Sequence, residues 1–525
     1  MKRTLTFIWL ILTLAGCATF PKNFQQIPST AFQYPERTEL GQFFASSIEQ
    51  QAEQSGFLLL NEGKGAILAR MALVDMAERT IDMQYYIWED DASGWLLMER
   101  AVRAAQRGVR VRILVDDITL SGRDFKMAAA LNAHFPNMEF RLYNPFSRRY
   151  RASFLRGFEF IRNISRLNHG MHNKIFAVDN QVAIVGGRNI GDTYFGTGLK
   201  LNYRDFDLFM AGPIAAEVSA SFDTYWNSKW AVPLETFKEI KPSPEDIDRA
   251  KKRLRETTAK FEKEYPYRLD ISRQDILKRL REIRDELIWA EAEVLYDPPD
   301  KGRTTEQQPG VPERLATLAQ EVQHDLLIES PFFIPSELML KRMGEIAGRG
   351  VNLRILTNSL ASTDVTIVHA AYGKYRYTML KSGVRLYELR ADAESRKLYL
   401  ADPVLPSKLG LHAKVVVFDK EKVFIGTLNL DPRSINLNTE VGILVHSAEL
   451  ARKVTEDLEV DFQAPNSWRL DLEHDGIQGE DNVETYLVWI TEKNGKEKRY
   501  YREPAGFWRK VSAFFLSFLP VEEQL

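Results

Sequence analysis

The 525-residue chain contains little cysteine, little net charge and no apolar run long enough to cross a membrane. Cys17 is its single cysteine, which excludes an intramolecular disulfide. The apolar run from Leu5 to Leu14 is shorter than the roughly 20 residues that span a bilayer, and no other run is long enough either. The formal net charge is −2, so the global basic field expected of a nucleic-acid-binding protein is absent.

A polar motif of the form H-x-K-x4-D is present twice, each time followed by Gly and then Asn at the same spacing. The first copy contains His172, Lys174, Asp179, Gly186 and Asn189, and the second contains His412, Lys414, Asp419, Gly426 and Asn429. A stretch before each copy also recurs, since residues 107–114 (RGVRVRIL) resemble residues 349–356 (RGVNLRIL). The chain is therefore a duplicated unit that carries one half-site per copy.

The residue types in this motif suit phosphodiester chemistry. The apolar run between Lys and Asp predicts a buried strand, so the alternation in His-x-Lys places both side chains on one face. Lysine binds phosphate oxygens as a compact cation, and histidine attacks phosphorus when neutral and donates a proton when charged. The alternative is a pair of ordinary core strands, but core packing does not require the same polar set twice.

At these residues the sequence resembles the phospholipase D superfamily, whose signature is this duplicated motif. Two stretches, Leu428–Glu440 and Gly186–Tyr194, are most similar to the cardiolipin synthase C branch of bacterial lipoproteins. The resemblance implies an α/β fold of two similar phospholipase D-like halves, each a mixed sheet flanked by helices. The active site is then expected at the pseudo-twofold interface of the halves.

The resemblance also implies a double displacement with a phosphohistidine intermediate. We choose His172 as nucleophile and His412 as general acid and base, although pseudo-symmetry leaves the two roles open. The candidate catalytic residues are His172, Lys174, Asp179, His412, Lys414 and Asp419. Of these, the two aspartates are expected to support the fold rather than the chemistry. Asn189 and Asn429 are expected to bind phosphate oxygens, and Glu440 and Asp205, with Asp207 as the alternative to Asp205, to orient the histidines. No metal and no cofactor is expected.

The acceptor decides the activity. With a lipid alcohol as acceptor, the enzyme is a phosphatidyltransferase that makes cardiolipin, as the branch resemblance implies; with water, it is a phospholipase D. The expected substrates are phosphatidylglycerol and, as an alternative donor, phosphatidylethanolamine, and no nucleic acid. A nuclease of the same superfamily and a membrane-tethered scaffold are less consistent with these features. The sequence does not identify a helper protein.

The N-terminus predicts attachment to a membrane. A charged start, a short apolar core and Leu14-Ala-Gly-Cys17 resemble the signal peptide and lipobox of a bacterial lipoprotein, in which Cys17 is lipidated. Two or more lipid chains give stable anchoring. We therefore expect a lipid-anchored protein of the cell envelope that faces the periplasm beside a membrane surface, with the inner or outer membrane left open.

Length and a hydrophobic content of 44% predict several domains with large cores. Residues 1–16 are expected to form the signal peptide, 17–50 a tether, 51–235 the first half, 236–304 a charged helical insertion, 305–465 the second half and 466–525 a C-terminal extension.

Three further segments are candidates for lipid contact. Residues 141–171 combine arginines with aromatic residues, which indicates either a solvated loop or a lip that binds anionic headgroups. The stretch from His369 to Arg376 resembles a substrate-cleft segment, although a core or surface histidine is the commoner case. Residues 507–520 predict either an interfacial helix or a final helix packed on the body.

Overall fold

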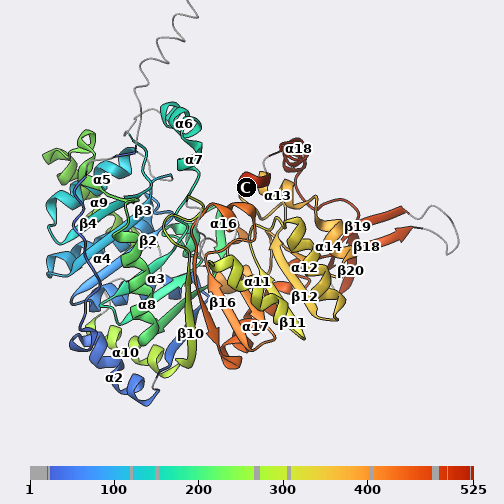
Figure 1. The fold of residues 1–525 in the computed structure, drawn as a ribbon, viewed down its shortest axis with the longest axis horizontal. Coiled ribbons are helices and arrows are strands. Elements are labelled where there is room, and N and C mark those ends of the chain that lie inside the picture. Colours follow the sequence, from blue (N-terminus) through green and yellow to red (C-terminus); the bar gives the residue numbers. More distant parts are fainter. Residues whose placement is uncertain are drawn as a thin grey trace, which may run out of the picture.

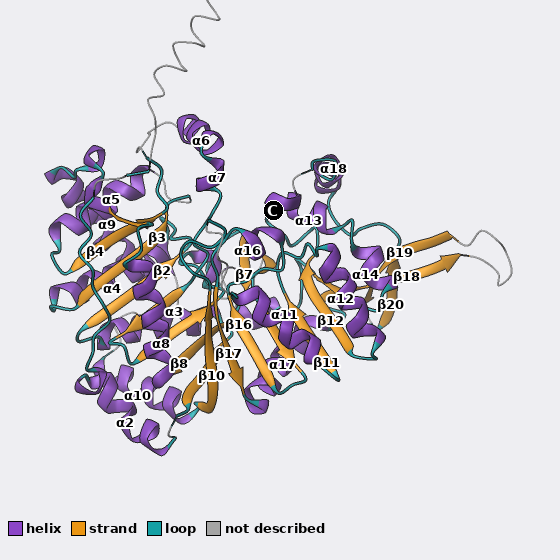
Figure 2. Ribbon diagram, in the orientation of Figure 1, coloured by secondary structure: helices purple, strands orange, loops and turns teal. Residues whose placement is uncertain are grey.

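The structure, a computed structural model, describes residues 20–21, 24–51, 53–118, 122–147, 153–264, 272–303, 309–400, 404, 407–475, 484–493, 495–520 and 522–525. Two similar halves lie side by side, with the chain colours dividing them near the middle of the sequence (Figure 1). The predicted fold class is confirmed, because each half is a mixed sheet flanked by helices (Figure 2). Cys17 lies outside the described residues.

The first half is built on a sheet in which three neighbouring strands are parallel and the others are antiparallel. Its strands are β1 (Ser55–Leu60), β2 (Thr80–Tyr85), β3 (Arg110–Asp116), β4 (Met138–Tyr143), β5 (Ile175–Val178), β6 (Val182–Gly186), β8 (Asp207–Ala211) and β9 (Ala231–Pro233). Hydrogen bonding places them in the order β9-β4-β3-β2-β5-β6-β8-β1.

The second half repeats this arrangement. Its strands are β11 (Asp325–Glu329), β12 (Asn352–Asn358), β13 (Arg385–Leu389), β15 (Val415–Phe418), β16 (Lys422–Gly426) and β17 (Val441–His446). They follow the order β13-β12-β11-β15-β16-β17, which matches β4-β3-β2-β5-β6-β8 strand for strand. Three antiparallel strands, β18 (Ser467–Asp475), β19 (Glu484–Lys493) and β20 (Lys496–Tyr500), extend the sheet beyond β13.

Helices cover both faces of the combined sheet. The first half carries α2 (Glu39–Gln50), α3 (Gly63–Met76), α4 (Ala92–Gln106), α5 (Gly122–His134), α6 (Ser153–Arg162), α7 (Ile164–Leu167) and α8 (Pro213–Trp226). In the chain the two halves are connected by α9 (Pro244–Glu264) and α10 (Arg273–Asp285), and α9 packs on α4 and α5 of the first half (Figure 1). The second half carries α11 (Val311–Glu321), α12 (Glu337–Gly348), α13 (Thr366–Tyr372), α14 (Arg376–Lys381), α15 (Arg396–Tyr399), α16 (Pro432–Asn436), α17 (Ala448–Phe462) and α18 (Phe507–Leu516).

One hydrophobic core is shared by the two halves. It contains Ile175 and Ala177 of β5, Val415 and Val417 of β15, and apolar residues of α8 and α17. Strands β5 and β15 of the repeated motif therefore both pack into the interface between the halves. The motif residues that precede each strand lie at this interface as well. None of the helices among the described residues is both long and apolar enough to cross a membrane.

The segment predicted to be a helical insertion also contains a strand that joins the halves, so this part of the prediction is wrong. The sequence predicts a helical insertion over residues 236–304, but α10 ends at Asp285 and β10 runs from Ile288 to Tyr296. The start of β10 pairs with β1 and its remainder pairs with β17, so the two half-sheets become one continuous sheet. Strand conformation depends on the neighbouring strands as well as on local sequence, and here pairing with β1 and β17 overrides the helical prediction.

The expected tether also contains ordered structure. Residues 39–50 form α2, and the preceding Thr38 caps this helix by accepting a hydrogen bond from Gly41 N with its side chain. Leu40 and Phe44 are fully buried in the core of the first half. Burial of these apolar side chains stabilises the folded protein, which a solvated tether would not do. The body of the protein therefore begins before residue 51.

Candidate active site

The aspartate of each H-x-K-x4-D motif stabilises the fold at the far end of its strand. Asp179 accepts three backbone hydrogen bonds from residues 78–80, at 2.7–2.9 Å. Asp419 accepts three from residues 323–325, also at 2.7–2.9 Å. Each carboxylate thereby fixes the start of the parallel strand beside it, β2 or β11. Neither aspartate forms a hydrogen bond to the motif histidines among the described residues.

Backbone pairing between the halves brings the two motifs together. Strand β7 (Leu201–Arg204) pairs with β14 (Lys408–Leu411), which leads directly into His412. On the other side of the interface, Met171 pairs with Thr439, and His172 N donates to Thr439 O at 2.9 Å. The backbone before His412 is thus hydrogen-bonded to the backbone before Asp205. The backbone at His172 is likewise hydrogen-bonded to the residue before Glu440.

Each histidine is oriented by a carboxylate from the opposite half. His172 Nδ1 lies 2.9 Å from Glu440 Oε2 and 3.1 Å from Thr427 O. His412 Nδ1 lies 2.6 Å from Asp205 Oδ2. Because a carbonyl oxygen only accepts, His172 Nδ1 is the protonated nitrogen, and its Nε2 keeps the lone pair. Neither half alone contains a complete histidine–carboxylate pair.

The two lysines lie beside the histidines and are almost completely buried. Lys174 Nζ donates to His172 O at 2.7 Å, and Lys414 Nζ donates to His412 O. Burial lowers the pKa of Lys174 to about 7, and the charge of Lys414 contributes to this shift. Burial also lowers the pKa of Lys414, to about 8, against the opposing effect of Asp205. A phosphodiester anion between them would favour the charged form of both lysines, so the site is built for an anion.

The two histidine–carboxylate pairs differ in charge. Burial alone would raise the pKa of Asp205, but His412 and Lys414 lower it to about 2, so this carboxylate stays ionised. Burial raises the pKa of Glu440 to about 7, so its negative charge is only partly present at neutral pH. The pKa of His172 is well below its ordinary value because of burial and the two lysines. Burial lowers the pKa of His412 to about 4, with Asp205 opposing the shift.

The two asparagines carry buried polar atoms without a hydrogen-bond partner in the described part of the chain. Asn189 Oδ1 accepts from Ile87 N at 3.1 Å, while its Nδ2 has no partner. Asn429 Oδ1 has no partner either. Unpaired buried polar atoms are costly in a folded protein, and a bound ligand is one way to satisfy them. An amide donor at Asn189 is the group type that a phosphate oxygen requires.

Sequence reasoning missed three tyrosines that surround the histidines. The ring of Tyr86 meets that of His172 edge-on at 5.1 Å. Tyr194 and Tyr203 each lie 5.1 Å from the ring of His412. Aromatic residues directly after a strand and after the Gly-Asn segment were visible in the sequence, but nothing in it showed that they meet the histidines across the site.

The two candidate carboxylates of the first half have different partners. Asp205 binds His412, whereas Asp207 forms ion pairs with Arg70 at 2.9 Å and Arg188 at 3.4 Å. Gly187 is required beside Asp205, because a Cβ at this position would lie 2.0 Å from Asp205 Oδ1. The equivalent position of the second half holds Thr427, whose hydroxyl donates to Glu440.

Two candidate headgroup contacts form structural interactions instead. His369 is buried, with its Nε2 2.6 Å from Glu503 Oε1. Arg376 Nε donates to Glu388 Oε1 at 2.8 Å, and a second guanidinium nitrogen lies 2.6 Å from Glu503 Oε1. Among the described residues, His369, Glu388 and Glu503 are the one group with metal-like spacing, and Arg376 already supplies its positive charge. This cluster therefore ties the C-terminal extension to the second half.

Within residues 141–171, the described arginines contact the protein itself. Arg156 donates to Asp117 O at 2.8 Å and packs over Phe146 at 4.4 Å. Arg166 donates to Asn144 Oδ1 at 2.9 Å. The prediction for Arg148, Arg149, Tyr150 and Arg151 lies outside the described residues.

Comparison with protein families finds a match in each half. The profile described as "Cardiolipin synthase, PLD-like domain" matches residues 71–226 and 315–462, more than half of the chain. The chain is 37% identical over 479 residues to cardiolipin synthase C of Escherichia coli (strain K12), covering 90% of this chain and 97% of that protein. It is 24% identical over 393 residues to a cardiolipin synthase of Clostridium perfringens (strain SM101 / Type A), covering 74% of this chain and 67% of that protein.

A solved structure supports the fold. The crystal structure of phosphatidylserine synthase from Haemophilus influenzae Rd KW20 superposes with a TM-score of 0.54 at 14% sequence identity. The superposition covers 81% of this chain and 91% of that chain. At this identity the likeness shows a shared fold, and the predicted superfamily and its cardiolipin synthase branch are confirmed by the sequence matches.

Proposed function

The chain belongs to the family of cardiolipin synthases with phospholipase D-like domains, and from this premise we propose that it is a membrane-anchored phosphatidyltransferase that makes cardiolipin through a phosphohistidine intermediate. The observation that carries the proposal is the pair of buried histidines at the interface, each held at Nδ1 by a carboxylate of the other half. Such a pair provides a nucleophile and a proton donor in one site, with two lysines for the phosphate.

In the first step His172 Nε2 attacks the phosphorus of the donor phospholipid. A P–N bond forms and the P–O bond to the headgroup alcohol breaks. His412 gives its proton to the departing oxygen, so the headgroup leaves as a neutral alcohol. The protein then holds a phosphatidyl group on His172, with Lys174 and Lys414 beside the phosphoryl oxygens.

In the second step the hydroxyl of a second lipid, such as phosphatidylglycerol, gives its proton to His412. Its oxygen attacks phosphorus, a new P–O bond forms and the P–N bond breaks. His172 is regenerated neutral and His412 is again protonated, so protons and bonds balance over the cycle. With water in place of the lipid alcohol, the same steps give phosphatidic acid, which is the alternative hydrolase.

The unequal carboxylates support the choice of His172 as nucleophile. Asp205 stays ionised and opposes the drop in the pKa of His412. Glu440 is partly neutral near pH 7 and therefore favours a charge on His172 less, whereas the two lysines lower the pKa of both histidines. A nucleophile must be neutral and a general acid must be protonated, so this electrostatic difference favours His172 in the first role and His412 in the second.

Membrane attachment through Cys17 completes the proposal. Both substrates are bilayer lipids, and a lipidated N-terminus would keep the enzyme at the membrane surface on the periplasmic side. Fatty-acid labelling of the wild-type chain and of Cys17→Ser in cells tests this part. Label that persists in the variant would contradict lipidation at Cys17 without bearing on the catalytic proposal.

Lipid analysis tests the activity directly. The purified full chain is incubated with vesicles that contain isotope-labelled phosphatidylglycerol, with or without phosphatidylethanolamine, and the products are separated by mass. We expect labelled cardiolipin, none with His172→Ala, and no loss of turnover in EDTA, because lysines supply the positive charge. Phosphatidic acid as the sole product would favour the hydrolase instead, and no product from either route would contradict the proposed function.

A further inference from the structure

Two helical segments from distant parts of the chain, α6–α7 and α18, expose large apolar side chains. Helix α18 has no buried residue, and its Trp508 and Phe515 are 78% and 66% exposed. Other exposed apolar residues in and after α18 are Phe507, Phe514, Phe518 and Leu519. In α6 and α7, Ile161 is 73% and Ile164 is 47% exposed, together with Leu155 and Phe158. Clusters of this kind mark an interaction surface, whereas single exposed apolar residues do not.

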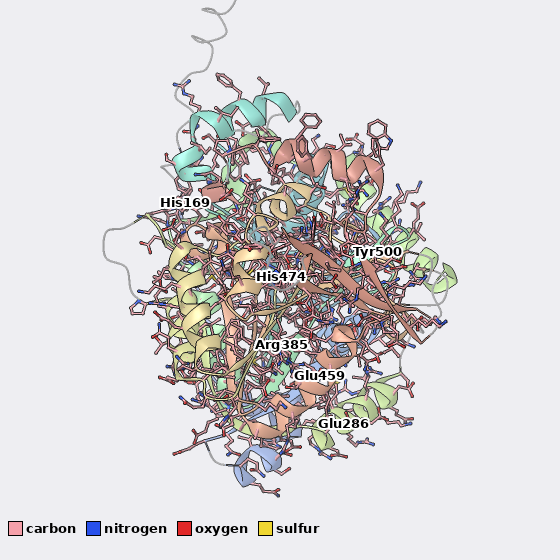
Figure 3. The ribbon with its side chains drawn as sticks, turned by 90° about the vertical axis from the view of Figure 1, so that its right-hand side faces the viewer. His169, Glu286, Arg385, Glu459, His474 and Tyr500 are labelled. Atoms are coloured by element: carbon pink, nitrogen blue, oxygen red, sulfur yellow. The ribbon has the colours of Figure 1, made fainter. Side chains whose placement is uncertain are left out.

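Both helices stand on the same side of the molecule. In two perpendicular views α6 and α18 project beyond the body at one edge (Figures 1 and 3). His169, which follows α7, lies directly beneath this edge in Figure 3. The edge is therefore also where the chain enters the first motif.

Hydrogen bonds place α18 near the second histidine. Arg509 of α18 donates to Ala361 O at 2.9 Å and also to Thr363 O. The next residue, Asp364, accepts a hydrogen bond from Tyr203 OH at 2.9 Å. The ring of Tyr203 in turn lies 5.1 Å from that of His412. On the other half, α7 ends at Leu167, shortly before His172. The exposed helices thus flank the histidine pair, one on each half.

We propose that the exposed faces of α6–α7 and α18 form one lipid-binding surface, which places the active site at the surface of the bilayer. This inference rests on the proposed function, because it names the membrane as the partner of that site. Its physical reason is the free-energy cost of extracting a substrate, which grows with every CH2 of an acyl chain that leaves the bilayer. An enzyme that reaches the phosphate at the interface avoids this cost, provided that its own surface enters the headgroup region.

The composition of the surface fits a bilayer interface. Trp and Phe prefer the boundary between headgroups and acyl chains, where a ring meets both apolar and polar surroundings. Lys510 is exposed on α18 beside these rings, and a cation at this depth is attracted to anionic headgroups. The two exposed clusters lie on opposite halves, so joint insertion would fix the tilt of the site as well as its distance from the membrane.

Site-specific labels test this surface on the full-length protein. Phe515→Cys and Ile161→Cys each add one thiol, and Leu338→Cys is the matched control, because Leu338 is 56% exposed on α12 away from the two helices. Each variant is labelled with an environment-sensitive fluorophore and mixed with vesicles of phosphatidylglycerol and phosphatidylcholine that contain nitroxide lipids. The wild-type chain is labelled in parallel, so that signal from Cys17 is subtracted. Point substitutions are used because truncation of the chain before α18 would also remove Gln524, whose side chain accepts a hydrogen bond from Asn168.

We expect strong quenching at positions 515 and 161, at least about fivefold above that at position 338. Quenching at both positions no greater than at position 338 would overturn the inference, and quenching at only one of them would overturn the joint surface. Turnover of a soluble phosphodiester by each labelled variant is measured as well. Turnover of the soluble substrate without quenching would contradict the lipid-binding surface alone. Absence of turnover by the wild-type chain would contradict the proposed function.

Discussion

The two half-sites share their histidine, lysine and asparagine but differ in the groups that hold them. His172 is bonded to Glu440, which also accepts from the hydroxyl of Thr427. His412 is bonded to Asp205, whose carboxylate fills the space that a side chain on Gly187 would need. Duplication thus supplied two equal reactive groups, and divergence of their partners made them electrostatically unequal. A double displacement requires this inequality, because one histidine must be neutral while the other is charged.

The largest expected effect is on the histidines themselves. His172→Ala and His412→Ala should each lower turnover by at least about 10²–10⁴-fold, the usual range for loss of a general acid or base. The two variants should differ with a substrate that has a good leaving group, such as a nitrophenyl phosphodiester. His412→Ala should still form phosphoenzyme in rapid-quench labelling, since attack needs no proton donor, whereas His172→Ala should form none. Label in His172→Ala but not in His412→Ala would reverse the two roles.

Exchange of the carboxylate partners should give the next largest effect. Asp205→Asn removes the ionised group that favours the protonated form of His412, so turnover should fall by about 10²-fold or more. Because the pKa of His412 then decreases, the high-pH limb of the activity profile should move to lower pH. Glu440→Gln should cost less at pH 7, since burial already raises the pKa of Glu440 to about 7.

The pH profiles separate an electrostatic role of these carboxylates from a purely structural one. A mere loss of positioning would lower activity equally at all pH values in both variants. Equal losses for Asp205→Asn and Glu440→Gln, with unshifted profiles, would contradict the inequality of the half-sites.

The aspartates of the two motifs should affect stability rather than chemistry. Both have positive φ angles, 54° for Asp179 and 50° for Asp419, which asparagine tolerates. In Asp179→Asn and Asp419→Asn, an amide N–H group would face a backbone N–H group in place of a carboxylate oxygen. Asp179 is fully buried, so its variant should lose about 2 kcal/mol, whereas the half-buried Asp419 is reached by water and its variant should lose less than about 1 kcal/mol. Urea denaturation measures both, and a larger loss at Asp419 would contradict the argument.

The sequence predicted the duplicated unit because it depends on local patterns that occur twice, and the family resemblance that these patterns support implied the α/β halves and an interfacial site. It identified Asp205 and Glu440 as orienting groups, but not that each serves the histidine of the other half. The pairing of each carboxylate with the histidine of the other half depends on the hydrogen bonding of β7 to β14. These two strands are about as far apart in the sequence as the two motifs. The role of β10 was missed for the same reason, since its strand conformation depends on partners in both halves. Non-local hydrogen bonds leave no periodic signal in the sequence of one partner.

The smallest expected effect concerns a buried position at which the halves differ. Glu329 of β11 pairs with Val415, the residue after Lys414, and Gln84 of β2 pairs with Ile175, the residue after Lys174. Gln84 Nε2 lies 3.0 Å from Met171 Sδ, whereas neither carboxyl oxygen of Glu329 has a hydrogen-bond partner among the described residues. Burial raises the pKa of Glu329 well above its ordinary value, and nearby Asp461 adds to this shift.

Glu329→Gln should therefore stabilise the protein in a pH-dependent way. The folded chain keeps a proton on Glu329 that the unfolded chain loses above about pH 4.5, the ordinary pKa of glutamate. Since the folded state binds more protons in this range, stability falls as pH rises toward the raised pKa, and glutamine escapes this loss. The melting temperature of the variant should match that of the wild type near pH 4 and exceed it by about 2–4 °C at pH 8. Gln84→Glu is the matched control, which should transfer the same pH-dependent loss to the first half. A difference in melting temperature that stays constant from pH 4 to pH 8 would show that Glu329 is ionised in the folded protein, and that this position does not distinguish the half-sites.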